Sequence, residues 1–596
     1  MSTRHFIKNF VLRFFAIIGI LTVIIMICAV IIVKSLADMK KEVKDNTVLH
    51  LKTSLITGDV ATEGDFFAFE SYFSSNISLI DTLLLIRKAA EDEKVVGIMA
   101  DISSLNLSYA QVEELRNELI RFSKTGKPIY VWSDTFGEII GGTKSYYLAS
   151  AFDKIFIQPA GNVGFTGISS DAMFFKNTLE KLDMEPIGSR RKEYKNYWNM
   201  FSEEKYTQEH KEAAQSLIDS IFNKVKTDIS RSRNIPVETL QQIADSFPLN
   251  SKEALKKGLI DEILFKDKAL EKLKNAVDYK SLISLSSYAK MTTDSFDFSD
   301  KPKIALIEMP GSIHRGTSDF GATGHPTSTG SVTMLSLLSE AWKDEKVKGI
   351  IIRVNSPGGS VIASETIWNK IRGMVKEKKK PVYISMGTVA ASGGYYVSMP
   401  AEKIFADHTT ITGSIGVVIG KIYMREFYKK LGITFDSVTT GKNNDMFSPI
   451  TRITDEQKNY VEKSLDNIYD DFVNRAAEGR KMKPEELEKS AKGRVWSGTL
   501  AKEKNLVDEN GGFMDTFDSI KEKTKEETLS VQKYPRPEKM WERFLTDYED
   551  DQYSGAFGWF ASVFHKVDVF FSTVNKVQRE MNNDEMIRAD ENLEIK

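Results

Sequence analysis

Short apolar runs alternate along much of the chain with stretches of helical spacing. "GIIIRV" (349–354) and "PVYISM" (381–386) are dominated by apolar and β-branched residues, as strands buried on both faces are. Between them, "SETIWNKIRGMVKEKKK" (364–380) has helical spacing and a basic last turn. Strands that alternate with helices predict an α/β fold with a parallel core sheet.

This pattern occurs twice. "DEKVVGIMADIS" (92–103) matches "DEKVKGIIIRVN" (344–355), and "GKPIYVWSD" (126–134) matches "KKPVYISMG" (379–387). The matches keep the same order at a separation of about 250 residues, far longer than the period of a solenoid. The chain of 596 residues is also too long for one ordinary core. We therefore expect two tandem copies of one α/β domain.

One stretch is neither strand-like nor amphipathic. "FFAIIGILTVIIMICAVIIV" (14–33) has 20 residues without a charge, and a helix of that length spans roughly 30 Å, the thickness of the hydrocarbon core of a bilayer. The flanking positive charges are nearly balanced and do not decide the orientation. A cleaved signal peptide is the alternative, but the run is long for one and "SLA" (35–37) is a weak cleavage site. We expect an uncleaved anchor in membrane lipid, with the bulk of the chain outside the cytoplasm.

Outside the two copies the pattern changes. Residues 279–302 lack clear periodicity and are expected to connect the copies. Residues 555–574 are aromatic-rich with few charges, which suits either an interfacial amphipathic helix or a helix docked on the protein's own surface. The predicted divisions are a cytoplasmic N-terminus (1–13), a transmembrane anchor (14–33), a first repeat (45–278), a connector (279–302), a second repeat (303–534) and a C-terminal tail (535–596).

Composition restricts the function classes further. The net charge of −2 gives no electrostatic reason to expect a nucleic-acid partner. The single cysteine, Cys28, lies in the apolar stretch, so neither an intrachain disulfide nor a cysteine metal cage is expected. The seven histidines show no ligand spacing. We therefore expect neither a metal nor a cofactor.

The two copies differ where chemistry would be placed. With the shared tyrosine pairs aligned, Ser392 lies opposite Thr143, and Ser414 lies opposite Phe165. The second copy alone has "NSPGGS" (355–360) after its first strand. It therefore carries a glycine-rich turn, a serine among small residues and a further serine downstream, none of which the shared fold requires.

These residues could perform acyl transfer. Backbone N–H groups of Gly358 and Gly359 can approach a substrate carbonyl closely and form an oxyanion hole, because no Cβ intervenes. Ser392, at a strand-to-helix turn, would be the nucleophile. Taken singly, each feature has a structural alternative, namely a type II turn at Pro357–Gly358 and a helix N-cap at Ser392. Their occurrence together after successive strands favours the catalytic interpretation.

At this point the sequence resembles a known family. "RVNSPGGSV", "MGTVAASGGYYVS" and "TGSIGV", in that order and spacing, are similar to motifs of signal peptide peptidase A, a family of membrane-bound serine proteases. The tandem repeat and the N-terminal apolar segment resemble the long, duplicated bacterial form. The resemblance covers roughly residues 45–530.

The resemblance implies two tandem Clp/crotonase-like repeats behind one transmembrane helix. It implies a serine endopeptidase that hydrolyses cleaved signal peptides and other short peptides with a Ser–Lys dyad and no cofactor. It further implies a homotetramer in the bacterial inner membrane, with most of the chain on the periplasmic side. The alternatives are a catalytically inactive membrane scaffold and a crotonase-type acyl-CoA enzyme.

A serine nucleophile requires a base, and the family uses lysine. By resemblance, Lys195 in "YKN" occupies the dyad position and Ser414 orients that lysine. Lys442 in "GKNNDMFS" (441–448) is the rival, because the shorter family members carry serine and lysine in one copy. His408, after a strand, and His210, in a polar run, are interpreted as surface histidines.

Local composition favours Lys195 over Lys442. A lysine acts as a base only if its pKa falls from about 10.4 toward neutrality, and burial lowers it. The neighbours of Lys442 are polar and would leave its pKa high. The residues expected to bury Lys195 are Tyr194, Tyr197, Trp198 and Phe201.

Overall fold

The computed structural model describes residues 42–59, 76–138, 141–292, 301–319 and 326–535, together with the single residue Gly19. Apart from Gly19, the predicted anchor lies outside the described residues, as does the tail from residue 536 onward. Across the parts of the chain that the structure describes, no helix is both long enough and apolar enough to cross a bilayer.

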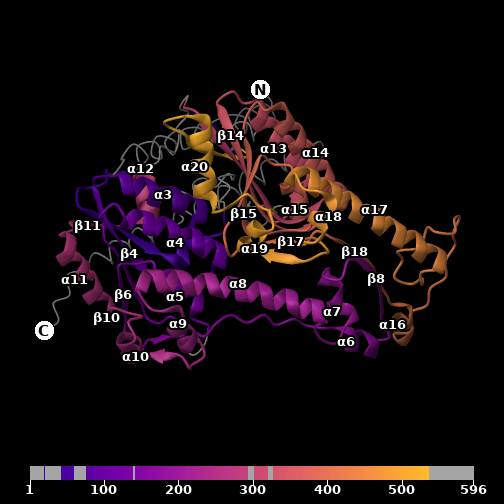
Figure 1. The fold of residues 1–596 in the computed structure, drawn as a ribbon, viewed down its shortest axis with the longest axis horizontal. Coiled ribbons are helices and arrows are strands. Elements are labelled where there is room, and N and C mark those ends of the chain that lie inside the picture. Colours follow the sequence, from indigo (N-terminus) through magenta and orange to yellow (C-terminus); the bar gives the residue numbers. More distant parts are fainter. Residues whose placement is uncertain are drawn as a thin grey trace, which may run out of the picture.

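The first repeat is built on a parallel six-stranded sheet in the order β10-β6-β5-β4-β1-β11. Figure 1 shows this half of the molecule in indigo to magenta. Its strands are β1 (Thr47–Lys52), β4 (Val95–Asp101), β5 (Ile129–Ser133), β6 (Lys154–Ile157), β10 (Glu262–Ile263) and β11 (Ser281–Ser284). The helices of this half are α3 (Leu79–Glu91), α4 (Tyr109–Ser123), α5 (Thr143–Ala149), α6 (Lys176–Lys181), α7 (Asn199–Ser202), α8 (Gln208–Arg233), α9 (Val237–Ala244), α10 (Ser251–Lys256), α11 (Lys266–Val277) and α12 (Leu285–Thr292).

The second repeat contains the larger sheet, whose main order is β13-β12-β14-β15-β16-β20. β21 pairs with β12, β17 pairs with β15, and β19 is antiparallel to β17. Its strands are β12 (Lys303–His314), β13 (Thr329–Gly330), β14 (Val347–Gly359), β15 (Val382–Ala391), β16 (Lys403–Ala406), β17 (Ile411–Gly413), β19 (Val495–Ser497), β20 (Glu509–Asn510) and β21 (Ser530–Tyr534). Its helices are α13 (Ser331–Lys343), α14 (Val361–Glu377), α15 (Gly393–Ser398), α16 (Arg425–Lys430), α17 (Asp455–Arg480), α18 (Pro484–Glu488), α19 (Gly498–Glu503) and α20 (Phe513–Thr524). The predicted α/β fold with parallel sheets is confirmed.

Matching hydrogen bonds show that the two halves share their packing. The hydroxyl of Tyr146 donates to the carbonyl of Leu259 (2.8 Å), and that of Tyr395 donates to the carbonyl of Leu506 (2.9 Å). Each half also has an arginine–aspartate pair beside this contact. The pairs are Arg233 with Asp261 and Arg480 with Asp508. The repeat read from the sequence is therefore also a repeat of specific buried contacts.

Part of the segment expected to connect the copies (279–302) packs as a strand and a helix of the first half. β11 pairs in parallel with β1, and Tyr288 of α12 is buried and donates to Asp92 (2.9 Å). The serines in "SLISLSS" conceal the strand, because they interrupt the apolar run that a buried strand would show. The position of the domain boundary stays a prediction, but the first sheet extends into residues 281–284.

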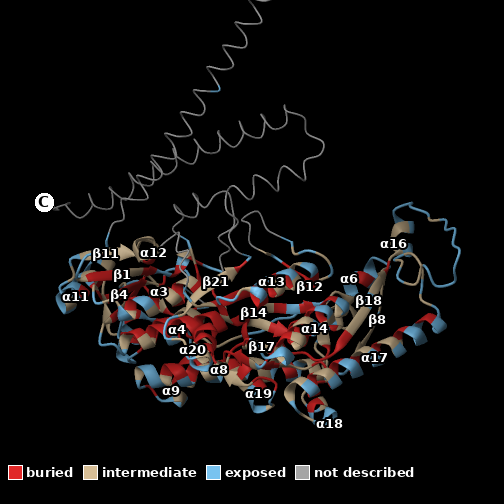
Figure 2. Ribbon diagram, turned by 90° about the horizontal axis from the view of Figure 1, so that it is seen from above, coloured by how far each residue is buried: buried red, intermediate tan, exposed pale blue. Residues whose placement is uncertain are grey.

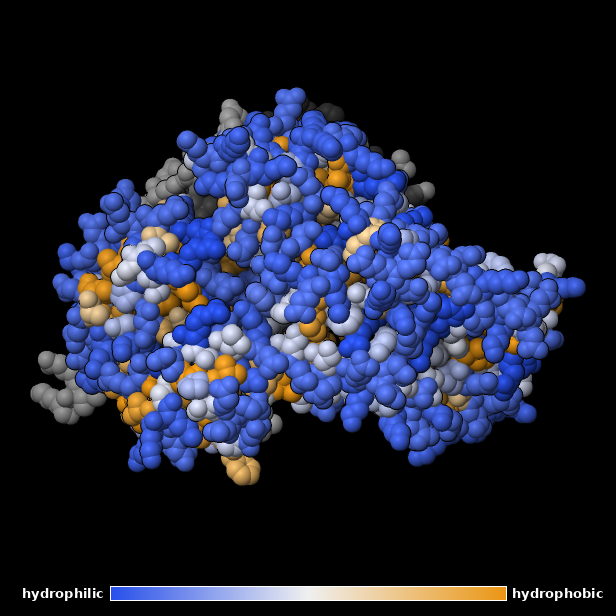
Figure 3. Space-filling model, in the orientation of Figure 1, coloured by the Kyte–Doolittle hydropathy of each residue, from blue (hydrophilic) through white to orange (hydrophobic). Residues whose placement is uncertain are grey.

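The second sheet is buried on both faces. Ile350 and Ile352 of β14 lie in a core that includes side chains of α13 and α14. Ile351, on the opposite face, joins a core shared with α20 and the first repeat. Alternating residues of one strand thus pack against different halves of the molecule. Figure 2 shows buried residues concentrated between the layers, and the outer face in Figure 3 is mainly hydrophilic.

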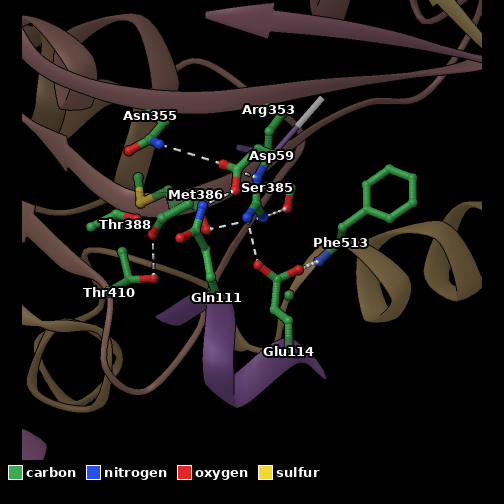
Figure 4. Close-up of polar contacts among 12 residues, drawn as sticks. Asp59, Gln111, Glu114, Arg353, Asn355, Ser385, Met386, Thr388, Thr410 and Phe513 are labelled. Atoms are coloured by element: carbon green, nitrogen blue, oxygen red, sulfur yellow. Dashed lines mark hydrogen bonds and ion pairs between the residues drawn. The ribbon is translucent and has the colours of Figure 1, made fainter. Parts of the chain in front are cut away.

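A buried ion cluster joins the two repeats (Figure 4). Arg353 of β14 is 0% exposed, and its Nε lies 3.1 Å from Oδ2 of Asp59 while Nη2 contacts Glu114. Glu114 also accepts the backbone N–H of Phe513 (2.7 Å), and Gln111 donates to Asp59. Burial opposes the charge on Arg353, but the two carboxylates more than offset it and raise its pKa above the usual range. The carboxylates of Asp59 and Glu114 in the first half therefore form buried ion pairs with Arg353 of the second half.

We predict that Arg353→Met destabilises the protein by about 3–5 kcal/mol, because it leaves two carboxylates buried without a counter-charge. Urea unfolding measures the change. The matched control is Lys268→Met, which removes an exposed ion pair with Glu271 and should change stability by about 0.5 kcal/mol or less. Equal stability of the two variants would contradict a stabilising role for the cluster.

Candidate active site

Ser392 lies at a sharp turn between β15 and α15. Its backbone has φ 55° and ψ −116°, a left-handed conformation that a serine rarely adopts. The turn is held by its N–H, which donates to the carbonyl of Gly413, and by its carbonyl, which accepts the N–H of Tyr396 (both 2.9 Å). Ser392 occupies the N-cap position of α15, but its side chain makes no capping hydrogen bond, so capping does not account for the hydroxyl. Such strain at a strand-to-helix turn is typical of exposed nucleophiles.

Small residues around Ser392 allow the end of β14 to approach it. A Cβ on Gly393 would lie 2.7 Å from Oγ of Ser364, and one on Gly358 would lie 2.9 Å from Cβ of Ser392. Either contact is shorter than real Cβ atoms show. The low side-chain bulk around this serine therefore permits two backbone segments to touch.

Lys195 comes from the first repeat and reaches Ser392 of the second. It follows β8 (Glu185–Arg191) and precedes the short 3₁₀ helix η2 (Asn196–Trp198). Its Nζ lies 2.9 Å from Oγ of Ser392 and 3.0 Å from both Oγ and the carbonyl oxygen of Ser414. Lys195 is only 5% exposed, and this burial lowers its pKa from 10.5 to about 7. Its amine is therefore available in the neutral form near neutral pH.

Ser414 follows β17 in a second strained position, with φ 53°. Its N–H donates to the carbonyl of Arg494 (2.7 Å), which fixes the backbone so that both of its oxygens meet the amine. Lys442, the rival lysine, is exposed, and its carbonyl accepts a hydrogen bond from Gln457 (3.3 Å). Among the described residues, no hydrogen bond joins the Lys442 side chain to Ser392.

The two glycines are not in a turn. Both belong to β14, where Gly358 and Gly359 pair with Ser312 and Ile313 of β12. Their positive φ values of 106° and 155° suit glycine, and a Cβ on Gly359 would lie 2.1 Å from the carbonyl oxygen of Ile313. The type II turn interpretation is therefore wrong.

The backbone N–H groups of Gly358 and Gly359 differ in their hydrogen bonds to side chains. The N–H of Gly358 donates to Oγ of Ser356 (3.1 Å). The N atom of Gly359 lies beside Gly393, since a Cβ on Gly393 would be 3.1 Å from it. Gly393 begins α15, so its own N–H has no partner within that helix. The amides of Gly359 and Gly393 are thus neighbours next to Ser392.

Of the four aromatic residues expected to bury Lys195, Tyr197 does not do so, whereas Tyr194, Trp198 and Phe201 are half-buried. Tyr197 is 68% exposed. The lysine is instead covered by backbone of the second repeat, where a Cβ on Gly493 would lie 2.6 Å from Cβ of Lys195. The N–H of Tyr194 also donates to the carbonyl of Lys492 (3.1 Å). This contact could not be found from the sequence, because the lone glycine in "AKGRVW" carries no motif.

The corresponding place in the first repeat is filled. Oγ1 of Thr143 donates to the carbonyl of Gly167 (2.9 Å). Phe165, opposite Ser414, packs against Tyr146 (ring centroids 6.1 Å apart) and Phe222 (5.6 Å). An aromatic cluster therefore stands where the second repeat has its serine–lysine contact.

Neither histidine belongs to the site. Nδ1 of His408 lies 2.6 Å from Oε1 of Glu113, at hydrogen-bond distance between the repeats. His210 packs edge-on against Tyr206, with ring centroids 4.6 Å apart. No group of three or more histidine, cysteine, aspartate or glutamate side chains could hold a metal ion within the described ranges.

Comparison with known proteins places this arrangement in a family. The model of peptidase family S49 matches residues 121–280 and 374–527, and the Clp protease model matches 326–411. The chloroplastic serine protease SPPA of Arabidopsis thaliana is 29% identical over 76% of this chain and 67% of its own length. Protease 4 of Haemophilus influenzae is 30% identical over 75% of this chain and 73% of its own.

Shorter matches are also found. A putative signal peptide peptidase SppA of Enterococcus faecium is 36% identical over 34% of this chain and 58% of its own length. Among solved structures, a mutant of ClpP1 from Listeria monocytogenes is 18% identical and covers 35% of this chain and 92% of its own, with a TM-score of 0.23 that is too low to support an argument.

The family model matches both halves of the chain and more than half of its residues, and two long relatives are named as proteases. These matches support a serine peptidase rather than either alternative from the sequence analysis, which were an inactive scaffold and an acyl-CoA enzyme. The chain belongs to peptidase family S49 and is a serine peptidase.

Proposed function

We propose that this protein is a membrane-anchored endopeptidase that hydrolyses cleaved signal peptides and other short peptides with a dyad of Ser392 and Lys195. The observation that carries the proposal is the 2.9 Å contact between Nζ of Lys195 and Oγ of Ser392, made across the two repeats by a buried amine. Serine attack requires a neutral base within hydrogen-bond distance, and this lysine meets both requirements.

In the proposed mechanism the neutral amine of Lys195 takes the proton of Ser392 as Oγ attacks the scissile carbonyl carbon. The resulting ammonium then donates that proton to the leaving amine, and the acyl-enzyme forms. In the second half-reaction Lys195 takes a proton from a water molecule as its oxygen attacks the ester carbonyl. The bond between the carbonyl carbon and Oγ then breaks, and the ammonium returns the proton to Oγ of Ser392. Ser414 orients the amine through its hydroxyl and its carbonyl.

The oxyanion would be stabilised by backbone N–H groups beside the nucleophile. We expected Gly358 and Gly359 to supply them, but the amide of Gly358 already donates to Ser356. The neighbouring amides of Gly359 and Gly393 are better placed, because Gly393 begins a helix and has no intrahelical acceptor. We therefore assign the oxyanion hole to Gly359 and Gly393.

The proposed substrate class and the proposed cellular location are supported by separate observations. The apolar residues 14–33 support a single-pass anchor in the bacterial inner membrane, with the peptidase repeats on the periplasmic side. The name of the Enterococcus faecium relative, a putative signal peptide peptidase, supports short membrane-released peptides as substrates. A homotetramer is proposed from the resemblance of the motifs alone.

We predict that a serine-directed acylating probe labels Ser392 in the intact protein, and that Ser392→Ala abolishes both labelling and peptide hydrolysis without unfolding. Alanine fits because Ala391 already precedes it and the hydroxyl caps no helix. Peptide mapping by mass spectrometry locates the adduct. Labelling of another serine, or normal turnover by the alanine variant, would place the nucleophile elsewhere.

We predict that Lys195→Met eliminates peptide hydrolysis, whereas Lys442→Met retains most of it. Methionine keeps the length and apolar character of the lysine stem but cannot accept a proton. Initial rates on a fluorogenic peptide compare the two variants, which differ in nothing but the lysine removed. Loss of activity in Lys442→Met alone would transfer the role of base to the second copy.

We predict that kcat/KM rises with pH through about 7 and then levels off, because burial lowers the pKa of Lys195 to about 7 and only the neutral amine is a base. Below the inflection the rate should fall about tenfold per pH unit. The profile is measured under conditions in which the fold is unchanged by circular dichroism. A rate that is constant through neutrality would be inconsistent with this base.

A further inference from the structure

The lysine and its serine partners lie at the same end of a two-stranded ribbon. β8 of the first repeat pairs antiparallel with β18 (Val417–Tyr423) of the second, from Arg191 opposite Val417 to Glu185 opposite Tyr423. Lys195 follows the end of β8, and Ser414 precedes the start of β18. The register of this ribbon therefore determines how the amine meets the serine.

Two glycines face each other in the middle of the ribbon, and Trp198 covers both. Gly188 pairs directly with Gly420. A Cβ on Gly188 would lie 2.3 Å from Cε2 of Trp198, and one on Gly420 would lie 2.3 Å from its Cη2. Neither glycine is at a positive φ, so the backbone itself does not require glycine there. Glycine weakens a strand, and a pair of them opposite each other marks the close approach of another group. That group is the indole ring.

Trp198 is also close to Lys195 along the chain. The two residues are joined by the single turn of η2, so a fixed indole fixes the backbone that carries the amine. On its other side this backbone contacts Gly493. The backbone of Lys195 is thus held between Trp198, which packs on the ribbon, and the loop of the second repeat that contains Gly493.

The charged groups around this segment are paired with one another rather than with the amine. Among the described residues, no carboxylate forms an ion pair with Lys195. The surrounding pairs are Arg191 with Glu462 and Asp466, Lys192 with Glu488, Glu193 with Lys492, and Arg494 with Glu212. The protonation state of the Lys195 amine therefore depends on where the amine lies and on its exclusion from water.

We infer that Trp198 is a positioning residue, whose indole in the slot formed by Gly188 and Gly420 holds Lys195 in its dry position against Ser392 and Ser414. The inference rests on the proposed function for its catalytic meaning. Its structural content, the position and solvation of one amine, can be measured without turnover. Loss of the ring, or of the slot, should let the amine move toward water and recover a more ordinary pKa.

The experiment compares four full-length single variants and one double variant with wild type. Trp198→Leu removes the ring, Gly420→Ala fills the slot, and Trp198→Phe keeps a smaller ring. Gly373→Ala is the matched glycine control, because nothing lies within 4 Å of a Cβ placed there. The first readout is the pH dependence of acetylation of Lys195 by acetic anhydride, mapped by mass spectrometry, since only a neutral amine reacts. The second is the pH profile of kcat/KM.

We expect the Lys195 inflection to rise by about one pH unit or more in Trp198→Leu and Gly420→Ala, which lowers kcat near neutrality about tenfold with little change in KM. The inflection should rise less in Trp198→Phe and stay at the wild-type value in Gly373→Ala. Gly420→Ala combined with Trp198→Leu should be no worse than Trp198→Leu alone, because the smaller side chain leaves room for the added methyl group.

An unchanged inflection in Trp198→Leu or in Gly420→Ala, measured on folded protein, would overturn the inference. Full additivity of the two changes in the double variant would also overturn it, because the ring and the slot would then act independently. If the inflection moves but wild type hydrolyses no peptide, the proposed function fails and the positioning role stands. If wild type is active and the inflection does not move, only the positioning role fails.

Discussion

A buried amine without a carboxylate partner is the constraint on which the proposed chemistry depends. Water and counter-ions both stabilise an ammonium group, and Lys195 has lost the first without acquiring the second among the residues described. Its remaining contacts are three oxygens of Ser392 and Ser414, which suit an uncharged amine as well as a charged one. Under the proposed chemistry, the exclusion of water from Lys195 is what would keep a neutral base available near neutral pH.

Keeping that amine dry requires the two repeats to be fixed against each other. The ribbon of β8 and β18 connects them beside the site, and the cluster of Arg353, Asp59 and Glu114 forms a second connection between them. Arg353 and Gly359 belong to the same strand, β14. The strand that contributes to the proposed oxyanion hole is thus also the strand that the first repeat holds by charge.

The sequence predicts the parts of this structure that depend on local pattern. The β-branched runs identify β14 and β15, and the divergence between copies singles out Ser392. The family resemblance supplied Lys195 and Lys442 as candidate bases, and the polar neighbours of Lys442 favoured Lys195. Of these two lysines, the structure places Lys195 beside the serine. The predicted tail, anchor and membrane orientation lie outside the described residues.

Contacts between distant segments were not predictable in this way. Arg353 is the one charged residue of the run "GIIIRV", and its partners are 294 and 239 residues away along the chain. The pairing of Gly188 with Gly420 likewise joins copies that the sequence presents only in series. The same limit explains the glycines of "SPGGS", because their place in β14 depends on pairing with β12 rather than on the local sequence.

The aromatic cluster around Phe165 has a consequence for how the two halves can be separated. The first half has packed rings where the second has a serine, so under the proposed chemistry the described residues form one site, to which the first half supplies the lysine and the second half the serine. Under the proposed chemistry, cutting the chain between the repeats would therefore give two inactive halves, one without the serine and one without the lysine. Mixing intact chains defective at residue 195 with intact chains defective at residue 392 would likewise restore nothing unless they exchanged halves, since under the proposed chemistry each pair is assembled within one polypeptide.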